Sequence, residues 1–323
     1  MKIGIITPAP PGSLYGNRIT ALRWAKILGR LGHSVSIAQQ YKDQRLDLLI
    51  ALHARRSYSS ILRFRRKHPD APIIVALAGT DLYRDLQVSQ RAQRSLDVAN
   101  RIVVLQPMAL KELRPAQRHK ARVIYQSVEG RLTKAKPGLA FKRSSSRGFD
   151  VVVIGHLRPV KDPFRAALAS RSLPASSQIR ILQIGGAMTR TMEQRARREM
   201  ETNQRYQWLG EFSRTRALRI LARSHLCIVS SRMEGGANVL SEAIVASVPV
   251  LASRIDGNVG ILDADYPGLF RVGDTRQLAR LLTQAETDSR FLAELRTRVK
   301  KLAPIFDPAK EEQTWARLLR ELR

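Results

Sequence analysis

Short apolar runs alternate with amphipathic segments along most of the chain, and this alternation limits the fold more than any other feature. The first run, residues 2–7, ends at Pro8 and leads through a loop into a segment with an apolar helical face. That face is expected to consist of Ala21, Leu22, Trp24, Ala25, Leu28 and Leu31. Uniformly apolar runs are typical of parallel strands covered on both sides by helices. The pattern therefore predicts an α/β fold with doubly wound parallel sheets.

The same alternation occurs twice, which predicts two Rossmann-like domains. Strands are expected at residues 33–38, 47–52, 72–77, 99–105, 121–124, 151–154, 179–184, 206–209, 226–229 and 248–251, and helices at 59–67, 163–170 and 191–202. Residues 133–150 are polar and lack apolar periodicity, so we interpret them as a linker. We expect domains at residues 1–140 and 150–305, facing each other across a cleft, and a final helix within residues 306–323.

The charge balance favours an anionic partner, such as nucleic acid, acidic lipid or a phosphorylated small molecule, and does not choose among them. Lys and Arg total 56 against 27 Asp and Glu, which gives a formal charge of +29. The basic residues are dispersed at helical spacing without a nucleic-acid-binding motif, so nucleic acid is not the expected partner. A single cysteine, Cys227, excludes an internal disulfide and a cysteine zinc cluster, and we expect it to be buried. Without a membrane-length apolar run or a signal peptide, we predict a cytoplasmic protein with no stable membrane association.

The most informative stretch is residues 234–243, where two carboxylates flank a glycine-containing turn and a helix start. The first-turn N–H groups of Ala237, Asn238 and Val239 would face an anion, because a helix start has unpaired donors and a positive dipole end. Glu242 can accept hydrogen bonds from a ribose diol, and Glu234 can accept them from sugar hydroxyls. The alternative is that both are ordinary acids near a helix N-terminus.

A second candidate element follows the first strand of the second domain. Arg158 and Lys161 lie within residues 155–163, at a strand end that faces the expected cleft. Two cations there suit a diphosphate leaving group, whose developing charge needs stabilisation when no metal is present. We expect neither a metal nor a cofactor. The alternative is a basic surface loop.

Taken together, these elements resemble family 4 of the GT-B glycosyltransferases over essentially the whole chain. The resemblance rests on the strand and glycine loop at the start, the Gly155-x-Leu157 element with Lys161, residues 209–210, and the Glu234-x7-Glu242 spacing. It implies an acceptor-binding N-terminal domain, a nucleotide-sugar-binding C-terminal domain, and a last helix that crosses back. It assigns catalytic roles to Glu234, Lys161 and Arg158, and donor binding to Gly16, His156, Gly235, Gly236, Ala237, Asn238, Val239 and Glu242.

The chain departs from this family at two positions. Family members commonly carry Arg where this chain has His156, and the arginine is displaced to Arg158, so either side chain could meet the diphosphate. Members also often carry His at the position of Ala78, before Gly79, where it borders donor and acceptor. The missing histidine suggests an acceptor other than a typical hydroxyl.

The N-terminal half is similar to the selenosugar synthases of selenoneine biosynthesis, in residues 8–10, 16–25, 52–57 and 79–85, together with 155–163. This resemblance implies that selenophosphate attacks the anomeric carbon of a UDP-sugar, with UDP-N-acetylglucosamine expected and UDP-glucose left open. A selenium anion is nucleophilic without a general base, and a small dianion suits Arg side chains. The expected acceptor-binding residues are Asn17, Arg18, His53, Arg55, Arg56, Thr80 and Asp81.

Five of these acceptor candidates also have a purely structural interpretation. Asn17 and Asp81 could cap helices, His53 could be a packed strand-end residue, and Arg55 with Arg56 could open an exposed basic helix. Two other functions stay open: a conventional family 4 transferase acting on a hydroxyl of a lipid or surface polysaccharide, and a nucleic-acid binder on a degenerate transferase scaffold. Handover of the product to the next enzyme of the pathway is a further possibility.

Overall fold

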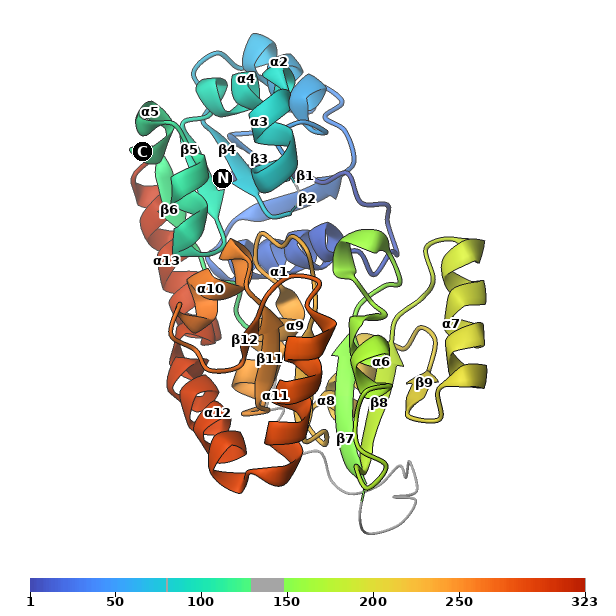
Figure 1. Cartoon of the computed structure of the whole chain (residues 1–323). Helices are drawn as coiled ribbons and strands as arrows, with labels where there is room; N and C mark the ends of the chain where they lie inside the picture. The colour runs from blue at the N-terminus through green and yellow to red at the C-terminus, as the bar shows by residue number, and fades with distance from the viewer. Residues whose placement is uncertain (80, 129–147, 323) are drawn as a thin grey trace. The chain divides into compact units, whose positions relative to one another are not determined.

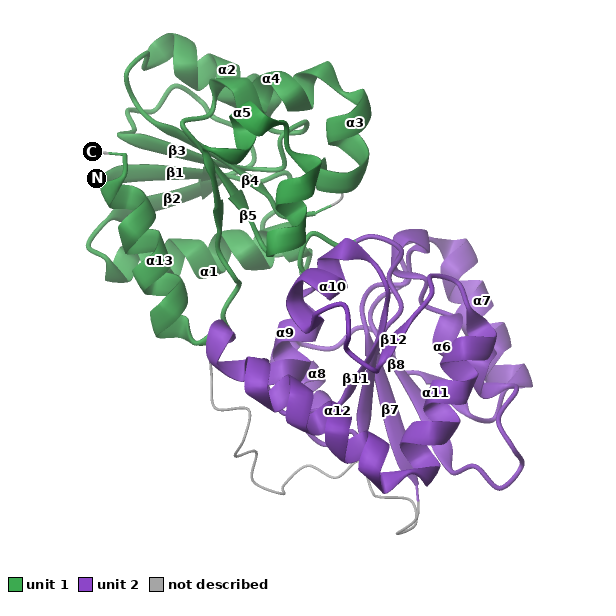
Figure 2. Cartoon of the chain, turned by 60° about the vertical axis from the view of Figure 1, so that its left-hand side comes forward, with its two compact units in different colours: residues 1–127, 234–236, 307–323 green, residues 128–233, 237–306 purple. Residues whose placement is uncertain are grey.

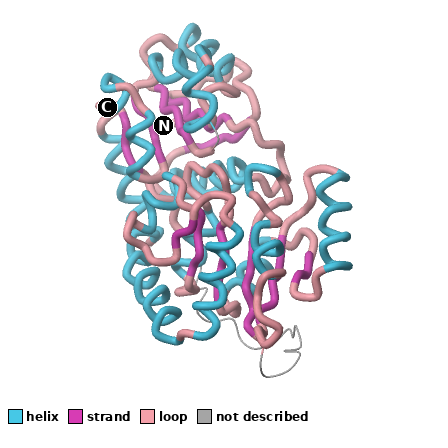
Figure 3. Tube along the Cα trace, in the orientation of Figure 1, coloured by secondary structure: helices cyan, strands magenta, loops and turns pink. Residues whose placement is uncertain are grey.

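The computed structural model describes residues 1–79, 81–128 and 148–322, and the chain divides into two compact units (Figure 2). Unit 1 consists of residues 1–127, 234–236 and 307–323, and unit 2 of residues 128–233 and 237–306. In each unit a group of strands is flanked by helices (Figure 3). Most of the predicted linker lies outside the described residues, and its last two positions, Phe149 and Asp150, already belong to a strand.

Unit 1 contains a six-stranded, fully parallel sheet with the order β2-β1-β3-β4-β5-β6 (Figure 1). Its strands are β1 (Lys2–Ile6), β2 (Ser34–Ala38), β3 (Leu48–Leu52), β4 (Ile73–Leu77), β5 (Arg101–Val104) and β6 (Ala121–Val123). Its helices are α1 (Gly16–Arg30), α2 (Tyr58–Lys67), α3 (Leu86–Val88), α4 (Gln90–Val98), α5 (Pro115–Arg118) and α13 (Pro308–Arg320), with the π-helix η1 (Asp81–Asp85) and the 3-10 helix η2 (Pro107–Glu112).

Alternation along the strands of unit 1 divides its core into two layers. Ile3 and Ile5 pack with Trp24 of α1, whereas Leu49 and Ala51 pack on the opposite face with helix α2. Successive strand side chains point to opposite faces, so a strand that is apolar throughout supplies both layers. One position of the predicted helical face is wrong: Leu22 is 50% exposed, because it lies on the outer side of α1.

The last helix, α13, belongs to unit 1 and packs against α1. Trp315 meets Trp24 edge to face, with ring centroids 4.9 Å apart, and both rings are fully buried. Glu311 is also buried and accepts hydrogen bonds from Trp24 Nε1 at 2.9 Å and from the Ser127 N–H at 2.7 Å. This helix therefore covers the same face of the sheet as α1.

Unit 2 contains a second six-stranded parallel sheet, with the order β12-β11-β10-β7-β8-β9. Its strands are β7 (Phe149–Ile154), β8 (Ile179–Ile184), β9 (Tyr206–Trp208), β10 (Leu226–Val229), β11 (Val250–Ser253) and β12 (Leu269–Phe270). Its helices are α6 (Arg165–Ser170), α7 (Arg190–Thr202), α8 (Arg214–Leu221), α9 (Asn238–Val245), α10 (Asp256–Leu262), α11 (Thr275–Thr287) and α12 (Ser289–Leu302), with the 3-10 helices η4 (Pro159–Lys161) and η5 (Ala303–Phe306).

The two parallel α/β sheets confirm the predicted fold class. Sequence patterning located most strands to within two residues but missed the two-residue strand β12 and several helices, among them α4, α8, α11 and α12. In α11 the buried residues Leu278, Leu282 and Ala285 do recur at helical spacing, so a signal was present. The described helices include none with the length and apolar character that crossing a membrane requires.

Candidate functional site

The strand order of each sheet identifies where a ligand is expected to bind. In a doubly wound sheet the ligand binds at the carboxyl ends of the two strands between which the winding reverses. In unit 1 the reversal lies between β1 and β3, and in unit 2 between β7 and β10. The candidate residues that follow β3, β7 and β10 are therefore placed at reversal points by the topology itself.

The turn after β7 is held in place by the segment after β10. The Arg232 N–H donates to the carbonyl of Val160 at 2.8 Å, and the Ser230 hydroxyl donates to the carbonyl of Lys161 at 3.1 Å. Lys161 ends the short helix η4, and its side chain lies over Gly155, with Cδ 3.8 Å from where a β-carbon on that glycine would stand. Arg158 is exposed on the same turn. Both predicted cations thus lie at the reversal point of unit 2.

His156, on this turn, has a partner that sequence reasoning missed. Its Nε2 lies 3.7 Å from a carboxylate oxygen of Glu211, which follows β9. Burial is the largest effect on the pKa of His156 and lowers it, while the Glu211 charge opposes the shift and Arg158 adds to it. A neutral imidazole is therefore favoured near neutral pH. Glu211 follows the strand end at residues 209–210, so its position after a parallel strand was the available signal.

The Gly155 turn and the turn after β8 approach each other too closely to admit a side chain. Gly185 has φ of +141°, and a β-carbon there would lie 2.2 Å from the Gly155 carbonyl oxygen and 2.9 Å from the His156 nitrogen. Because both groups are backbone, no rotamer change relieves the clash. Gly185 is therefore required for the geometry of the candidate donor turn.

We predict that Gly185→Ala destabilises the protein by about 3 kcal/mol or more, from overpacking combined with backbone strain. Gly210→Ala is the matched control, because Gly210 also has a positive φ of +74° but has no atom within 4 Å of a β-carbon. It should cost only about 1–2 kcal/mol, the strain of the left-handed conformation alone. Urea-unfolding midpoints measure both variants, and equal shifts would contradict the close approach.

Helix α9 begins after an N-cap residue that provides no side-chain acceptor, Ala237. The Leu240 N–H donates to the Ala237 carbonyl at 3.0 Å in its first turn. The preceding N–H groups are those that a helix start presents to an anion. Glu242, one turn further on, is buried and forms an ion pair with Arg214 at 2.7 Å, a partner that the sequence did not indicate.

The Glu234-x7-Glu242 element is divided between the two units, which the sequence did not predict. Glu234, Gly235 and Gly236 belong to unit 1, and Ala237 onward belongs to unit 2. In unit 1, a β-carbon on Gly235 would lie 2.9 Å from the carbonyl carbon of Ala78 and from the nitrogen of Gly79. Only glycine allows this approach, so the backbone of residue 235 packs directly on the loop after β4. Glu234 is partly buried.

Two of the predicted acceptor ligands are buried among protein groups. Asp81 is fully buried and accepts hydrogen bonds from the N–H groups of Ala54 at 3.1 Å and Gly79 at 3.0 Å. His53 is 4% exposed, 3.9 Å from Asp81 and 3.6 Å from Asp85. In this structure the side chains of His53 and Asp81 join the loops after β3 and β4, which is the structural role that the sequence offered as the alternative.

Of the other acceptor candidates that the structure describes, Arg55 and Arg56 are exposed, and Asn17 and Arg18 are partly buried. Arg55 and Arg56 are exposed just before α2, and Arg55 Nε pairs with Asp85 at 2.9 Å. Arg18 lies in the first turn of α1, beside Gly16 and Asn17. The Asn17 side chain lies 4.0 Å from where a β-carbon on Gly79 would stand, so α1 reaches the loop after β4.

Thr80 lies outside the described residues. Cys227 is fully buried, as expected, and burial raises the pKa of its thiol. Within residues 1–79, 81–128 and 148–322 no group of His, Cys, Asp and Glu side chains has the geometry of a metal site.

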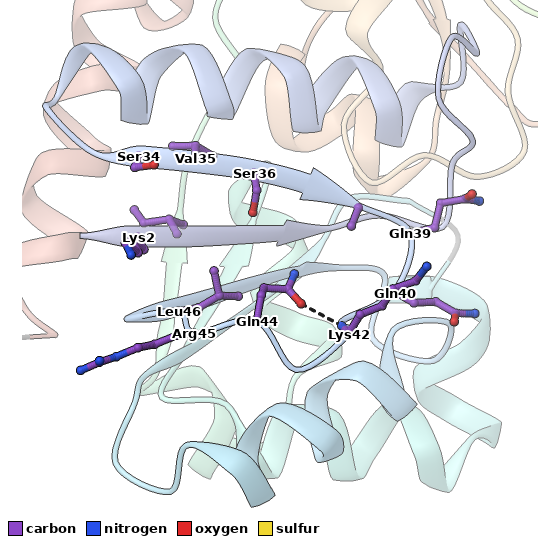
Figure 4. A pocket seen from close by; sticks show the side chains of 12 residues that line it. Lys2, Ser34, Val35, Ser36, Gln39, Gln40, Lys42, Gln44, Arg45 and Leu46 are labelled. Carbon is purple, nitrogen blue, oxygen red and sulfur yellow. Dashed lines mark hydrogen bonds between the residues drawn. The ribbon is translucent and has the colours of Figure 1, made fainter.

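A cavity in unit 1 lies apart from these residues. It has a volume of about 860 Å³ and runs along β2, the edge strand, and the loop at residues 39–46 (Figure 4). Its lining includes Lys2, Lys42 and Arg45, and the Lys42 N–H donates to the Gln44 side chain at 2.9 Å. None of the candidate site residues lines it. The cavity follows an edge of the sheet rather than its point of reversal.

Solved structures with the same fold cover nearly the entire chain. HepE from Anabaena in complex with UDP-glucose matches with a TM-score of 0.79 at 17% identity, over 99% of this chain and 100% of that chain. Sucrose-phosphate synthase from Thermosynechococcus elongatus matches with 0.80 at 15% identity, over 99% and 98%. A glycosyltransferase from Rickettsia africae matches with 0.75 at 13% identity, over 99% and 98%. A search among curated proteins finds no significant match.

A family comparison covers the part of the chain that contains the Gly155 turn, Lys161 and the start of α9. The model for "Glycosyl transferases group 1" matches residues 140–304, just over half of the chain. Its boundaries enclose the reversal point of unit 2, where the predicted cations and helix start were found. The chain therefore belongs to the glycosyl transferases group 1 family.

Proposed function

We propose that this glycosyltransferase joins selenophosphate to the anomeric carbon of a UDP-sugar, UDP-N-acetylglucosamine being the expected donor. The observation that carries the donor half is the reversal point of unit 2, where Lys161 and the start of α9 follow the two central strands. HepE, which has a similar fold, has been solved with UDP-glucose, and this supports a UDP-sugar.

The donor would be bound by groups of different chemistry. First-turn N–H groups of α9, at Asn238 and Val239, and the Lys161 ammonium would balance the diphosphate charge. The Glu242 carboxylate, oriented by Arg214, would accept from the ribose, and Glu234 would accept from the sugar hydroxyls. Because the Lys161 ammonium and the first-turn N–H groups of α9 can stabilise the leaving diphosphate, we propose that no metal is needed.

The acceptor half of the proposal rests on the sequence resemblance and on the exposed Arg residues of unit 1. A phosphorus oxyanion suits Arg55 and Arg56, which follow β3 at the reversal point of that sheet. The selenium atom would form a bond to the anomeric carbon while the carbon–oxygen bond to UDP breaks and its electron pair goes to UDP. Water would then cleave the phosphorus–selenium bond, which yields the selenosugar and phosphate.

Mass spectrometry with purified protein, UDP-N-acetylglucosamine and fresh selenophosphate tests this proposal. A sugar with the selenium isotope pattern, together with UDP, is the expected result, and thiophosphate and omission of acceptor are the controls. Parallel reactions with UDP-glucose identify the donor. UDP release that requires a hydroxyl acceptor would instead support a conventional transferase. Absence of UDP binding would contradict the donor assignment.

A further inference from the structure

The ion pair between Arg55 and Asp85 lies at the carboxyl end of β3 and fixes one edge of an exposed guanidinium. Arg55 Nε is 2.9 Å from Asp85 Oδ2; the arginine side chain is 45% exposed, whereas the aspartate side chain is only 9% exposed. A guanidinium has five donors, so a contact through Nε leaves the Nη donors to a second acceptor. Within the described residues, Asp85 is the one carboxylate at ion-pair distance from Arg55.

A strained, buried residue, His53, lies beside Asp85. His53 has φ of +75°, which costs about 1–2 kcal/mol for a residue with a β-carbon and persists only where its surroundings enforce it. Its Nδ1 accepts the Arg56 N–H at 3.4 Å, so the ring hydrogen is on Nε2, which faces Asp85 Oδ2 at 3.6 Å. Burial lowers the pKa of His53 and so favours this neutral form.

The loop after β4 holds the same turn from the other side. Asp81 joins the N–H groups of Ala54 and Gly79, and the Ser95 hydroxyl of α4 donates to the Ala54 carbonyl at 2.8 Å. Asp81 and Asp85 are the first and last residues of the π-helix η1. Short π-helical segments are rare and are often found at functional sites. Thus β3, η1 and α4 all fix the turn that carries Arg55.

We propose that Asp85 is a positioning residue that holds the Arg55 guanidinium so that its Nη donors bind two oxygens of a phosphoryl anion. This inference rests on the proposed function, in which that anion is the phosphoryl group of selenophosphate. A fork of two parallel N–H donors matches a tetrahedral oxyanion and gives it a defined orientation. A neutral hydroxyl offers no pair of charged oxygens to such a fork and would gain much less from it, so the Arg55–Asp85 pair favours anionic acceptors.

Calorimetric titration of the full-length protein with thiophosphate, a stable phosphoryl anion, tests the inference. Arg55→Ala should weaken binding by about tenfold or more, the magnitude of a lost charge-assisted pair, and Asp85→Asn by about fivefold. In the Arg55→Ala background, Asp85→Asn should have no further effect, because Asp85 acts through Arg55. UDP affinity should be unchanged, and the KM for selenophosphate should rise more than kcat falls.

Asp43→Asn is the matched control. Asp43 also pairs with an arginine of unit 1, Arg63 of α2, through Arg63 Nε at 2.7 Å, but it lies in the loop after the edge strand. It should bind thiophosphate like the unsubstituted protein. If Asp85→Asn does not fold, Arg55→Lys keeps the charge without the fork, and it should lose nearly as much affinity as Arg55→Ala.

The outcomes separate this inference from the proposed function. Selenosugar formation with equal thiophosphate affinity in Asp85→Asn and the unsubstituted protein would overturn the positioning role and leave the function standing. Additive effects of Asp85→Asn and Arg55→Ala would overturn it as well. UDP binding with no thiophosphate binding and turnover only on a hydroxyl acceptor would overturn the proposed acceptor, and the inference with it.

Discussion

The Lys161→Ala variant is expected to lose about two to three orders of magnitude in kcat for sugar transfer, because the proposed function assigns to Lys161 the stabilisation of developing charge on the leaving diphosphate. Lys161 ends η4 on the turn after β7, and the Ser230 hydroxyl and the Arg232 N–H hold that turn against the segment after β10. The ammonium is therefore attached to a backbone position fixed by two loops. UDP release under saturating substrate measures the loss.

Lys161→Arg should recover part of this activity, since it restores the charge with a different shape. Arg180→Ala is the control for removing a cation from unit 2: Arg180 lies in β8 and pairs with Asp150 at 2.6 Å on the protein surface. It should keep full activity, because an exposed ion pair contributes little to the stability of the fold. Full turnover by folded Lys161→Ala protein would contradict the assignment of Lys161 to the diphosphate.

The Glu311→Ala variant is expected to lower the free energy of unfolding of unit 1 by about 2–5 kcal/mol, because two buried donors lose their acceptor. These donors are Trp24 Nε1 of α1 and the N–H of Ser127, the last residue of the first segment of unit 1. A carboxylate here joins α13, α1 and the end of that segment. An alanine side chain has no polar group that could replace the Glu311 carboxylate as acceptor.

Glu312→Ala provides a control one residue away on the same helix. Glu312 is 32% exposed and pairs with Arg30 at 2.7 Å, so its removal should cost about 1 kcal/mol or less. Urea unfolding followed by tryptophan fluorescence measures both variants, since Trp24 and Trp315 form the buried pair beside Glu311. Equal midpoints for the two variants would show that the buried hydrogen bonds are not important for stability.

The candidate donor residues could be located from the sequence, because the position of each one depends on the strand or helix next to it in the chain. Gly155, Lys161 and Asn238 follow predicted strands or begin a predicted helix, and the carboxyl ends of parallel strands meet at one edge of a sheet. The position of Glu211 after a strand could be located in the same way, but the pairing of side chains from different segments could not. Glu211 beside His156, and Arg214 beside Glu242, come from a separate part of unit 2, and no periodic pattern links them to their partners.

Burial separated the predicted acceptor residues into two kinds. The sequence analysis named His53, Arg55 and Asp81 as acceptor-binding residues and kept a structural role as the alternative for each. In the structure, His53 and Asp81 are buried and join the loops to each other, while Arg55 stays exposed and pairs with Asp85. Which side chain of a turn points inward depends on backbone angles such as the positive φ of His53, and residue types alone do not determine these angles.

Apolar patterning by itself determined that this chain forms two parallel α/β sheets, because strands that are apolar throughout must be covered on both faces and parallel strands need crossovers. It also determined which loops carry the candidate chemistry. Only the tertiary structure decided the assignment of Glu234 and Gly235 to unit 1, the packing of α13 on α1, and the partners of His156, Glu242 and Arg55. Each of these depends on contacts between residues far apart in the chain, which strand order and side-chain packing establish and local sequence does not encode.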